Sequence, residues 1–333
     1  MAWRDIYGQE LVKRVFEAHL VSGSTPNAYL LVGLEGIGKR RLAVEMAKAI
    51  NCTSKDARPC DSCRVCGQIM RGTHPDVHLL LPGGASEQIK IDQIRHVISR
   101  IGLRPFSAAF QVVVLDGAER LTEEAANSLL KSLEEPTAHT RFILTTAQLS
   151  DCLPTVISRC QILRCQPLSV EIIVKILTET QSATPEIARK IASLCGGSAA
   201  KAVDLLQSWQ AHEQRLARFI EPSLAVWGGL SSSAESRQEV AQFLDAMMLW
   251  LRDVAFLATG TSSWVHYTEH KKVLSGQAEQ VDLDRCLETA DKLVALRASI
   301  DQYVSPRLIA SVAREKWFSL MEQRLSAERS ANG

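Results

Sequence analysis

The sequence lacks any long apolar run, and this absence excludes a membrane-spanning protein. No stretch approaches the roughly 18 consecutive apolar residues that a transmembrane helix needs. The N-terminus, Met1 to Asp5, is also without the apolar core of a secretory signal peptide. Internal repeats and low-complexity tracts are missing as well, and disorder is not expected. These absences together predict a soluble, cytoplasmic protein.

An excess of charge of either sign is lacking too. The 38 basic and 37 acidic residues leave a formal net charge of +1. A near-neutral chain has no overall field to hold DNA non-specifically, so any nucleic-acid contact must come from a local patch or from an assembly. With 333 residues, of which 46% are hydrophobic, the chain suits two or three globular domains with cores of their own.

A glycine-rich turn after an apolar strand carries the main chemical signal. Gly33, Gly38 and Lys39 have the G-x-x-x-x-G-K-[ST] spacing, with Gly36 inside the turn. In such a loop the backbone N–H groups surround phosphate and the lysine reaches the outer phosphates. The last position holds Arg40 instead of a hydroxyl residue, and a guanidinium cannot coordinate Mg²⁺. We predict a phosphate-loop fold that lacks the magnesium-binding hydroxyl.

Asp116, at the end of the apolar run 111–115, is a second nucleotide-site signal. In phosphate-loop ATPases an aspartate here holds Mg²⁺ through water, and the next acidic residue activates the attacking water. Here Gly117 comes next, and we expect Glu119 to point elsewhere because it lies on a tight turn. Asp116 can equally cap a helix that starts near Ala118, so both roles stay open.

Four of the nine cysteines have the spacing of a metal site. They are Cys52, Cys60, Cys63 and Cys66. In a reducing compartment, four thiolates within 15 residues can close a tetrahedron around Zn²⁺, and a filled tetrahedron leaves no position for water. We therefore predict a structural zinc rather than a catalytic one. His74 and His78 are near enough to replace a ligand, although ordinary loop or strand-edge positions suit them better.

The remaining pattern up to residue 165 alternates strands with helices, which predicts a parallel sheet covered on both faces. A helix opens at Thr122 and stops at Pro136, and a strand follows at 141–146. Its last residues, Thr145 and Thr146, lie where open α/β sheets place ligands. On a helix after residue 90, Arg95, His96 and Arg100 suit either a nucleic-acid backbone or, more readily, solvent.

Several motifs in this half of the chain occur in an order typical of one family. They are Gly8-Gln9, the loop Gly33 to Arg40, the four-cysteine insert, Thr73 to Asp76, Ala125 to Pro136, and Ser158-Arg159-Cys160. Together they resemble the clamp-loader branch of the AAA+ ATPases, found in bacterial DNA polymerase III. The insert combined with Leu-Leu-Lys-x-Leu-Glu-Glu-Pro and Ser-Arg-Cys is highly specific.

The resemblance implies an α/β AAA+ domain within a ring-like pentamer that loads a sliding clamp onto primed DNA. Its partners would be the other clamp-loader subunits, of delta and tau or gamma type. Arg159, flanked by Ser158 and Cys160, would act as an arginine finger on ATP bound by a neighbouring motor subunit. The residues alone favour an intramolecular salt bridge for Arg159.

The resemblance also explains the altered phosphate loop. Some clamp-loader subunits keep the fold without working nucleotide chemistry, and Arg40 and Gly117 both depart from the motor pattern in that direction. We therefore expect no independent ATPase activity. Lys39 is retained, which leaves residual binding of nucleotide or phosphate open.

Three domains are predicted: the AAA+ domain 1–165, a small helical lid 166–207 and a helical collar for oligomerisation 208–333. In the lid, Ala200 or Lys201 occupies the nucleotide-sensing position, and neither is arginine. Three wide apolar stripes indicate helices that pack against more than one neighbour, which the resemblance implies to be a collar, while a self-contained bundle needs only somewhat narrower stripes. The three stripes are Val240, Leu244, Met247, Met248, Leu251, Val254 and Ala255; Leu283, Cys286, Leu287, Ala290, Leu293, Val294 and Leu296; and Leu308, Val312, Trp317, Leu320, Met321 and Leu325. Residues 260–263 and 276–277 are expected to be loops.

Three functions remain to be compared. We favour a clamp-loader scaffold subunit that does not hydrolyse ATP. An active motor subunit of the same complex is opposed by Arg40 and Gly117. A stand-alone zinc-dependent DNA-binding protein is opposed by the near-neutral charge and by the lack of an aromatic and basic stripe.

Overall fold

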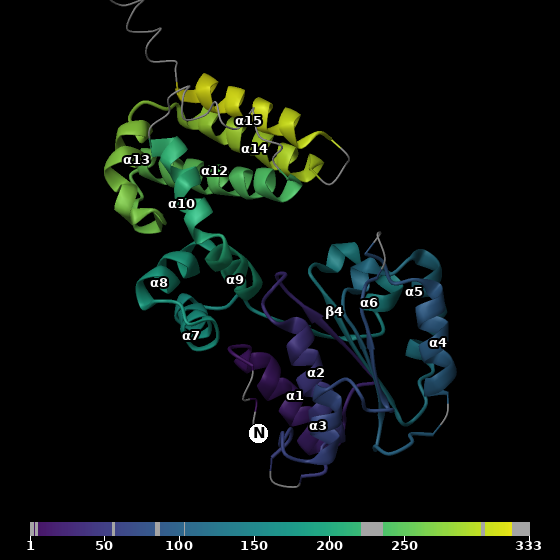
Figure 1. The fold of residues 1–333 in the computed structure, drawn as a ribbon. Helices are drawn as coiled ribbons and strands as arrows, with labels where there is room; N and C mark the ends of the chain where they lie inside the picture. The colour runs from purple at the N-terminus through teal and green to yellow at the C-terminus, as the bar shows by residue number, and fades with distance from the viewer. Residues whose placement is uncertain are drawn as a thin grey trace, which may run out of the picture. The chain divides into compact units, whose positions relative to one another are not determined.

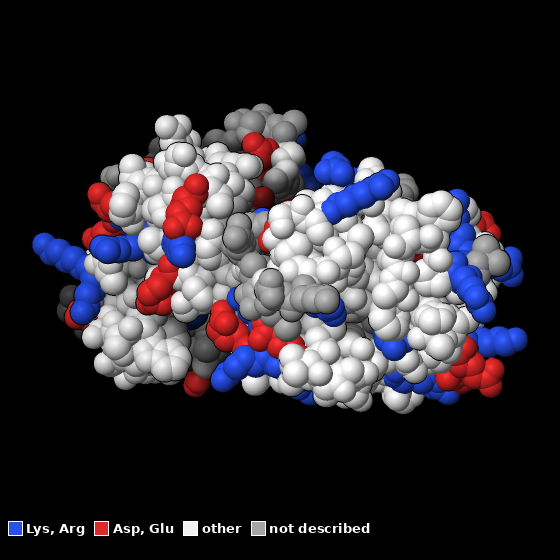
Figure 2. Space-filling view, turned by 90° about the horizontal axis from the view of Figure 1, so that it is seen from below, with Lys and Arg blue, Asp and Glu red and all other residues white. Residues whose placement is uncertain are grey.

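The computed structural model describes residues 3, 6–54, 57–83, 87–102, 104–220, 236–300 and 304–321. The chain divides into two compact units, Met1–Val203 and Asp204–Gly333. Among the described helices, none combines the length and apolarity needed to cross a bilayer. On the face drawn in Figure 2, basic and acidic side chains are scattered among uncharged ones, as the balanced composition predicts.

The first unit is built on a five-stranded parallel sheet, which confirms the predicted sheet type (Figure 1). Its strands, in the order β2-β3-β4-β1-β5, are β1 (Ala28–Val32), β2 (Val77–Leu80), β3 (Gln111–Leu115), β4 (Thr140–Thr146) and β5 (Gln161–Arg164). Parallel neighbours need crossover connections, which the intervening helices supply. The carboxyl ends of β1, β3 and β4 consequently meet at one edge of the sheet.

Helices cover both faces of this sheet (Figure 1). One face carries α1 (Glu10–Ser22), α2 (Lys39–Asn51) and α3 (Arg64–Met70), and the other carries α4 (Ile91–Ile101), α5 (Glu123–Glu134) and α6 (Pro154–Ile157). Successive strand residues face opposite sides. Leu30 of β1 therefore packs in the core beneath α4, α5 and α6, whereas the ring of Tyr29 contacts Phe16 of α1. Burial on both sides explains why the central strands read as continuous apolar runs.

Local signals fix the ends of α5 as predicted. The Thr122 hydroxyl accepts a hydrogen bond from the backbone N–H of Ala125 at 3.3 Å and so caps the first turn. The helix ends at Glu134, two residues before Pro136. Short 3₁₀ turns, η1 (Ala118–Arg120) and η2 (Leu149–Asp151), follow β3 and β4.

Three helices follow the last strand of the sheet: α7 (Val170–Gln181), α8 (Pro185–Leu194) and α9 (Ala199–Gln207). The Ser169 hydroxyl caps α7 by accepting from the N–H of Ile172. The backbone N–H of Ala200, in the first turn of α9, donates to the carbonyl of Gly36 at 3.1 Å. The start of α9 is thereby joined directly to the phosphate loop.

Every described element of the second unit is helical. These elements are α10 (Trp209–Ile220), α12 (Arg237–Ala258), η4 (Ser262–Trp264), η5 (Thr268–His270), α13 (Lys271–Ala278), α14 (Leu283–Ser299) and α15 (Pro306–Met321). Its centre is aromatic, with the ring of Phe219 5.0 Å from that of Trp317 and 5.8 Å from that of Trp250. The expected loop at 276–277 is wrong, because both residues lie inside α13.

The predicted apolar stripes are only partly buried. On α12, five of the seven stripe residues are buried. On α14, Leu287 and Val294 are 52% and 57% exposed, and Leu308 on α15 is also exposed. Leu325 of the third stripe lies outside the described residues.

Candidate phosphate-loop site, cysteine cluster and Arg159

The phosphate loop connects the buried strand β1 to the first turn of α2, and its glycines are favoured by positive φ angles or by close neighbouring atoms. Gly36 and Gly38 have positive φ angles of 79° and 92°, which favour glycine. A Cβ at Gly36 would lie 2.3 Å from the Ser198 hydroxyl oxygen, and one at Gly33 would lie 2.6 Å from the Cys165 carbonyl oxygen. These glycines therefore allow the loop to adopt its tight backbone conformation.

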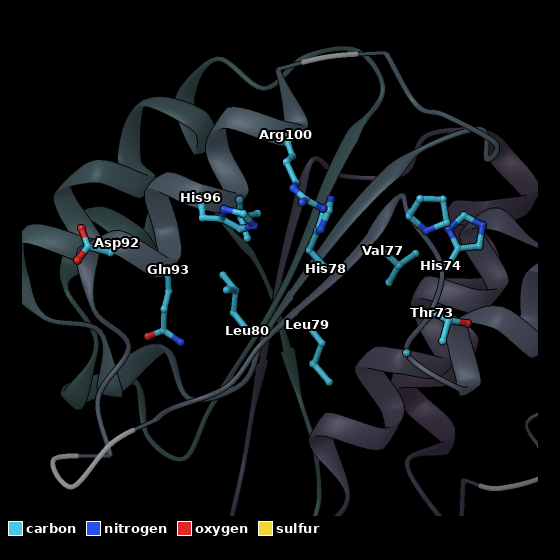
Figure 3. A pocket seen from close by; sticks show the side chains of 13 residues that line it. Thr73, His74, Val77, His78, Leu79, Leu80, Asp92, Gln93, His96 and Arg100 are labelled. Atoms are coloured by element: carbon cyan, nitrogen blue, oxygen red, sulfur yellow. The ribbon is translucent and has the colours of Figure 1, made fainter.

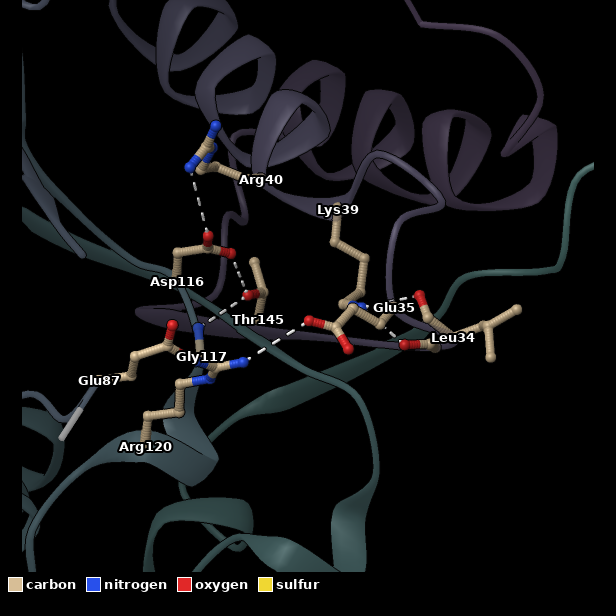
Figure 4. A network of polar contacts seen from close by, with 10 residues as sticks. Leu34, Glu35, Lys39, Arg40, Glu87, Asp116, Gly117, Arg120 and Thr145 are labelled. Carbon is tan, nitrogen blue, oxygen red and sulfur yellow. Dashed lines mark hydrogen bonds and ion pairs between the residues drawn. The ribbon is translucent and has the colours of Figure 1, made fainter. Parts of the chain in front are cut away.

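Lys39 is turned back onto its own loop (Figure 4). Its Nζ donates to the carbonyl oxygens of Gly33 at 2.7 Å and Leu34 at 2.9 Å. Burial lowers the pKa of Lys39, and nearby acidic groups, Glu119 among them, oppose this shift. The ammonium thus lies within the loop, where the motif spacing predicts it.

Asp116 is held by two other elements (Figure 4). Its Oδ1 accepts a 2.7 Å hydrogen bond from the Thr145 hydroxyl of β4, and its Oδ2 lies 3.9 Å from Nη1 of Arg40. Thr145 in turn accepts from the N–H of Gly117 at 3.1 Å. The alternative role of Asp116 as a helix cap is wrong, because Gly117 occupies the cap position of η1 and no side chain caps it. The guanidinium of Arg40 therefore faces the carboxylate of Asp116.

The prediction for Glu119 is also wrong. Gly117 adopts a left-handed conformation, with φ of 87°, and η1 turns Glu119 back so that it lines the same cavity as Lys39 and Asp116. This cavity has a volume of about 590 Å³. The phosphate-loop site thus contains a second carboxylate, that of Glu119, which we expected to point elsewhere.

A cluster around Arg120 was missed by the sequence reasoning. Its guanidinium forms ion pairs with Glu87 and with Glu35 of the loop, the latter at 3.6 Å (Figure 4). Ala200 lines the same cavity, whereas the neighbouring Lys201 is exposed to solvent. No local pattern marks Arg120, since its partners are more than 30 residues away in the sequence.

The four predicted cysteines come together. The sulfur atoms of Cys52, Cys60, Cys63 and Cys66 all lie within 4.8 Å of one another. Tetrahedral Zn–S bonds of about 2.3 Å place sulfurs roughly 3.8 Å apart, so this donor set fits a zinc ion. Cys60 Sγ accepts from the N–H of Cys63 at 3.3 Å, and Cys63 Sγ accepts from that of Cys66 at 3.4 Å. Hydrogen bonding from Ser62 contributes most to lowering the pKa of Cys60 to about 6, which favours the thiolate that binds metal.

A buried lysine joins the cysteine loop to α2. Lys48 is fully buried, and its Nζ lies 2.7 Å from Oε1 of Glu45 in the same helix. It also forms an ion pair with Asp61, which lies between Cys60 and Cys63. The cysteine cluster is consequently fastened to the helix that follows the phosphate loop.

His74 and His78 are not part of the cysteine cluster among the described residues. His74 is buried, and its Nδ1 accepts from the N–H of Asp76 at 3.1 Å. His78 lines a cavity of about 680 Å³ between β2 and α4, together with His96 and Arg100 (Figure 3). Burial, and then the charge of Arg100, lowers the pKa of His78. These histidines therefore have roles separate from metal binding by the cysteines.

Arg159 follows α6 and makes the intramolecular salt bridge that the residues alone favour. It forms an ion pair with Glu134, and its Nη1 donates to the carbonyl of Thr155 at 2.8 Å and to the Ser158 hydroxyl at 3.1 Å. Cys160 packs against the core, and burial raises its pKa to about 12. Arg159 itself remains partly exposed.

The family model described as "DNA polymerase III, delta subunit" matches residues 8–169. The chain is 36% identical over 219 residues to DNA polymerase III subunit delta' of Bacillus subtilis, covering 65% of this chain and 64% of that protein. It is 38% identical over 159 residues to subunit delta' of Pseudomonas aeruginosa, covering 47% and 46%. It is 35% identical over 211 residues to subunit gamma of Buchnera aphidicola, covering 62% and 58%.

The chain thus spans less than two thirds of the length of each of these relatives. Both delta' and gamma subunits are among them, so likeness alone does not separate the two types. Residues 8–169 therefore match this family model, and the chain is similar to both delta' and gamma subunits of DNA polymerase III.

Proposed function

We propose that this chain is a delta-prime-type subunit of a DNA polymerase III clamp loader and does not itself hydrolyse ATP. The observation that carries the proposal is the contact between Arg40 and Asp116. In a motor subunit, a hydroxyl side chain at the position of Arg40 and a carboxylate at the position of Asp116 together hold a hydrated Mg²⁺. Here a permanent cation is covalently attached at the hydroxyl position and faces the carboxylate, so it repels a divalent metal ion.

The proposed contribution to catalysis is made in trans by Arg159. In the assembled complex its guanidinium would pair with the γ-phosphate oxygens of ATP held by a neighbouring motor subunit, with Ser158 and Cys160 forming its support. A planar, permanently charged fork suits this role, because it stabilises charge that develops on the transferring phosphoryl group. Sliding clamp and primed DNA would then be contacted through the complex.

The domain division proposed with this function is an AAA+ domain 1–165, a lid 166–207 and a collar 208–333. Exposed apolar side chains on the collar helices support an assembly role. Leu287 and Val294 lie seven residues apart on α14, so they share one face of that helix. A monomeric bundle gains nothing from exposing them, whereas a neighbouring collar would bury them.

Zinc is proposed as the metal of the cysteine cluster, with a structural role. A zinc ion held by Cys52, Cys60, Cys63 and Cys66 would cross-link the loop. It would not be catalytic, because four thiolates complete its coordination and leave no position for water or substrate. The chain's own contribution is the ion pair of Lys48 with Asp61, which docks this loop on α2.

Glu119 favours a second candidate function, an active motor subunit of tau or gamma type. It lines the cavity with Lys39, so a carboxylate capable of activating water lies near the phosphate loop. The two candidate functions therefore differ chiefly in whether Arg40 prevents ATP hydrolysis by this chain.

Measured ATP hydrolysis by the purified chain separates them. We expect no turnover above background for the unmodified chain, with Mg²⁺ and saturating ATP. The Arg40→Thr variant restores the hydroxyl and frees Asp116, and should gain Mg²⁺-dependent nucleotide binding. Arg41→Thr, which alters the neighbouring arginine, is the matched control and should gain nothing. Robust turnover by the unmodified chain would establish the motor function instead.

A further inference from the structure

The C-terminal ends of two helices meet at Arg159. Helix α5 ends at Glu134, and α6 ends at Ile157. The Nη1 group of Arg159 donates to the Thr155 carbonyl and to the Ser158 hydroxyl, while Nη2 pairs with Glu134. Both terminal nitrogens of the guanidinium are thus engaged within the chain.

The electrostatics of the helix ends explain why the arginine rests there. The last carbonyls of a helix have no partner within it, and the helix C-terminus carries partial negative charge. Glu134 adds a full negative charge at the end of α5, where a carboxylate is unfavourable. The guanidinium offsets this charge and also caps α6 through the carbonyl of Thr155.

We propose that Glu134 is a positioning residue that holds Arg159 in reserve until a neighbouring subunit presents a nucleotide. This inference rests on the proposed function, because it assumes that Arg159 acts in trans. Carboxylate and phosphate oxygens are alternative partners for the same guanidinium fork. Arg159 therefore exchanges the Glu134 carboxylate for the γ-phosphate, and Glu134 sets the concentration of ATP at which the exchange occurs.

The expected effect is moderate, since Arg159 and Glu134 are both partly exposed. Ion pairs of this kind shift an equilibrium by about two- to fivefold. Such a contact is weak enough to be displaced by a triphosphate and strong enough to keep the arginine away from other acidic groups.

The first experiment uses the isolated full chain and needs no partner. Phenylglyoxal modification of Arg159, followed by mass spectrometry, measures how available the guanidinium is. We expect Glu134→Gln to raise the modification rate about two- to fivefold, because it keeps the size of the side chain but removes its charge. Glu135→Gln is the matched control, since the adjacent Glu135 is exposed and makes no ion pair among the described residues. Equal rates in the unmodified chain and Glu134→Gln would overturn the proposal.

The second experiment uses the complex reconstituted with motor subunits of tau or gamma type, clamp and primed DNA. We expect Glu134→Gln to lower the ATP concentration for half-maximal turnover about two- to fivefold, with Glu135→Gln unchanged. Arg159→Ala, measured in parallel, should depress turnover. A higher ATP requirement in Glu134→Gln would overturn the reserve role, because Glu134 would then be needed to aim the arginine.

The two proposals fail in distinguishable ways. If Arg159→Ala depresses turnover while Glu134→Gln leaves the ATP requirement unchanged, the trans role stands and the role of Glu134 is wrong. If Arg159→Ala leaves turnover unchanged, the trans role of Arg159 is wrong. The positioning role of Glu134 is then wrong as well, whatever the modification rates show.

Discussion

Asp76 shows how a single side chain organises a loop that carries no regular structure. Its carboxylate accepts from the backbone N–H groups of Phe106 at 2.6 Å, Ser107 at 2.7 Å and Ala108 at 2.9 Å. Burial tends to raise the pKa of Asp76, but these donors outweigh it and hold the pKa below its usual range. The motif Thr73 to Asp76 was recognised from the sequence, whereas this role depends on residues 30 positions away.

Replacing Asp76 with asparagine should destabilise the first unit by about 2 kcal/mol, because hydrogen bonds to a charged acceptor are lost and an amide N–H₂ faces backbone donors. Urea unfolding followed by circular dichroism measures the change. Asp92→Asn on the exposed surface of α4 is the control and should stay within about 0.5 kcal/mol. Equal unfolding midpoints for both variants would contradict the anchoring role.

The second unit should be sensitive to acid through His212. Burial, and then the charge of Arg215, lowers the pKa of His212 from 6.5 to about 4. Because the folded state disfavours the protonated form, stability is full above pH 6.5 and falls as the pH drops toward 4, by up to about 3 kcal/mol.

Urea unfolding at pH 7 and at pH 4.5 tests this expectation. His212→Gln should lose less stability between the two pH values than the unmodified chain, since glutamine does not titrate. His139→Gln, at an exposed position of the first unit, is the control and should behave as the unmodified chain does. An undiminished pH dependence in His212→Gln would assign the acid sensitivity to other groups.

At the scale of elements, signals contained within a few residues predicted the structure well. The hydroxyl of Thr122 and the stop at Pro136 bound α5, and the cysteine spacing gave the cluster. The predictions were wrong where the structure depends on contacts between residues that are far apart in the sequence. Gln277 lies inside α13 because its amide accepts from Trp250 Nε1 at 2.7 Å and donates to the carbonyl of Phe219 at 2.8 Å. Glu119 was misplaced for a related reason, since the φ angle of Gly117 redirects the chain.

The cysteine cluster should behave as one cooperative element with α3. We expect one tightly bound zinc per chain, and its removal by a chelator should increase amide hydrogen exchange across residues 57–71, which lose their cross-link. Cys63→Ser should bind less zinc and show the same exchange without chelator. Cys195→Ser, at a buried cysteine outside the cluster, should keep the metal. Metal analysis that finds none in freshly reduced protein would refute a zinc site.

For the whole molecule, exposed apolar side chains occur in both units, and their arrangement along a helix decides what they can do. Val21 and Phe106 of the first unit are exposed, whereas Leu287 and Val294 of the second unit are exposed on one shared face of α14. Side chains of this size each contribute about 1–2 kcal/mol when an interface covers them. The proposed assembly through residues 208–333 therefore has a physical source in this row on α14, independent of any nucleotide.

Replacing Leu287 and Val294 together with glutamate should weaken assembly with the other clamp-loader subunits at least about tenfold, because two buried carboxylates would lack partners in the interface. Analytical ultracentrifugation of the reconstituted mixture measures the loss. The isolated variant should keep its helical content, since both side chains are exposed in the monomer. Val21→Glu on α1, where the side chain is 82% exposed, is the control and should assemble normally. If the double variant assembles as well as this control, the collar contact must lie on another face, and the exposed row on α14 is ordinary surface.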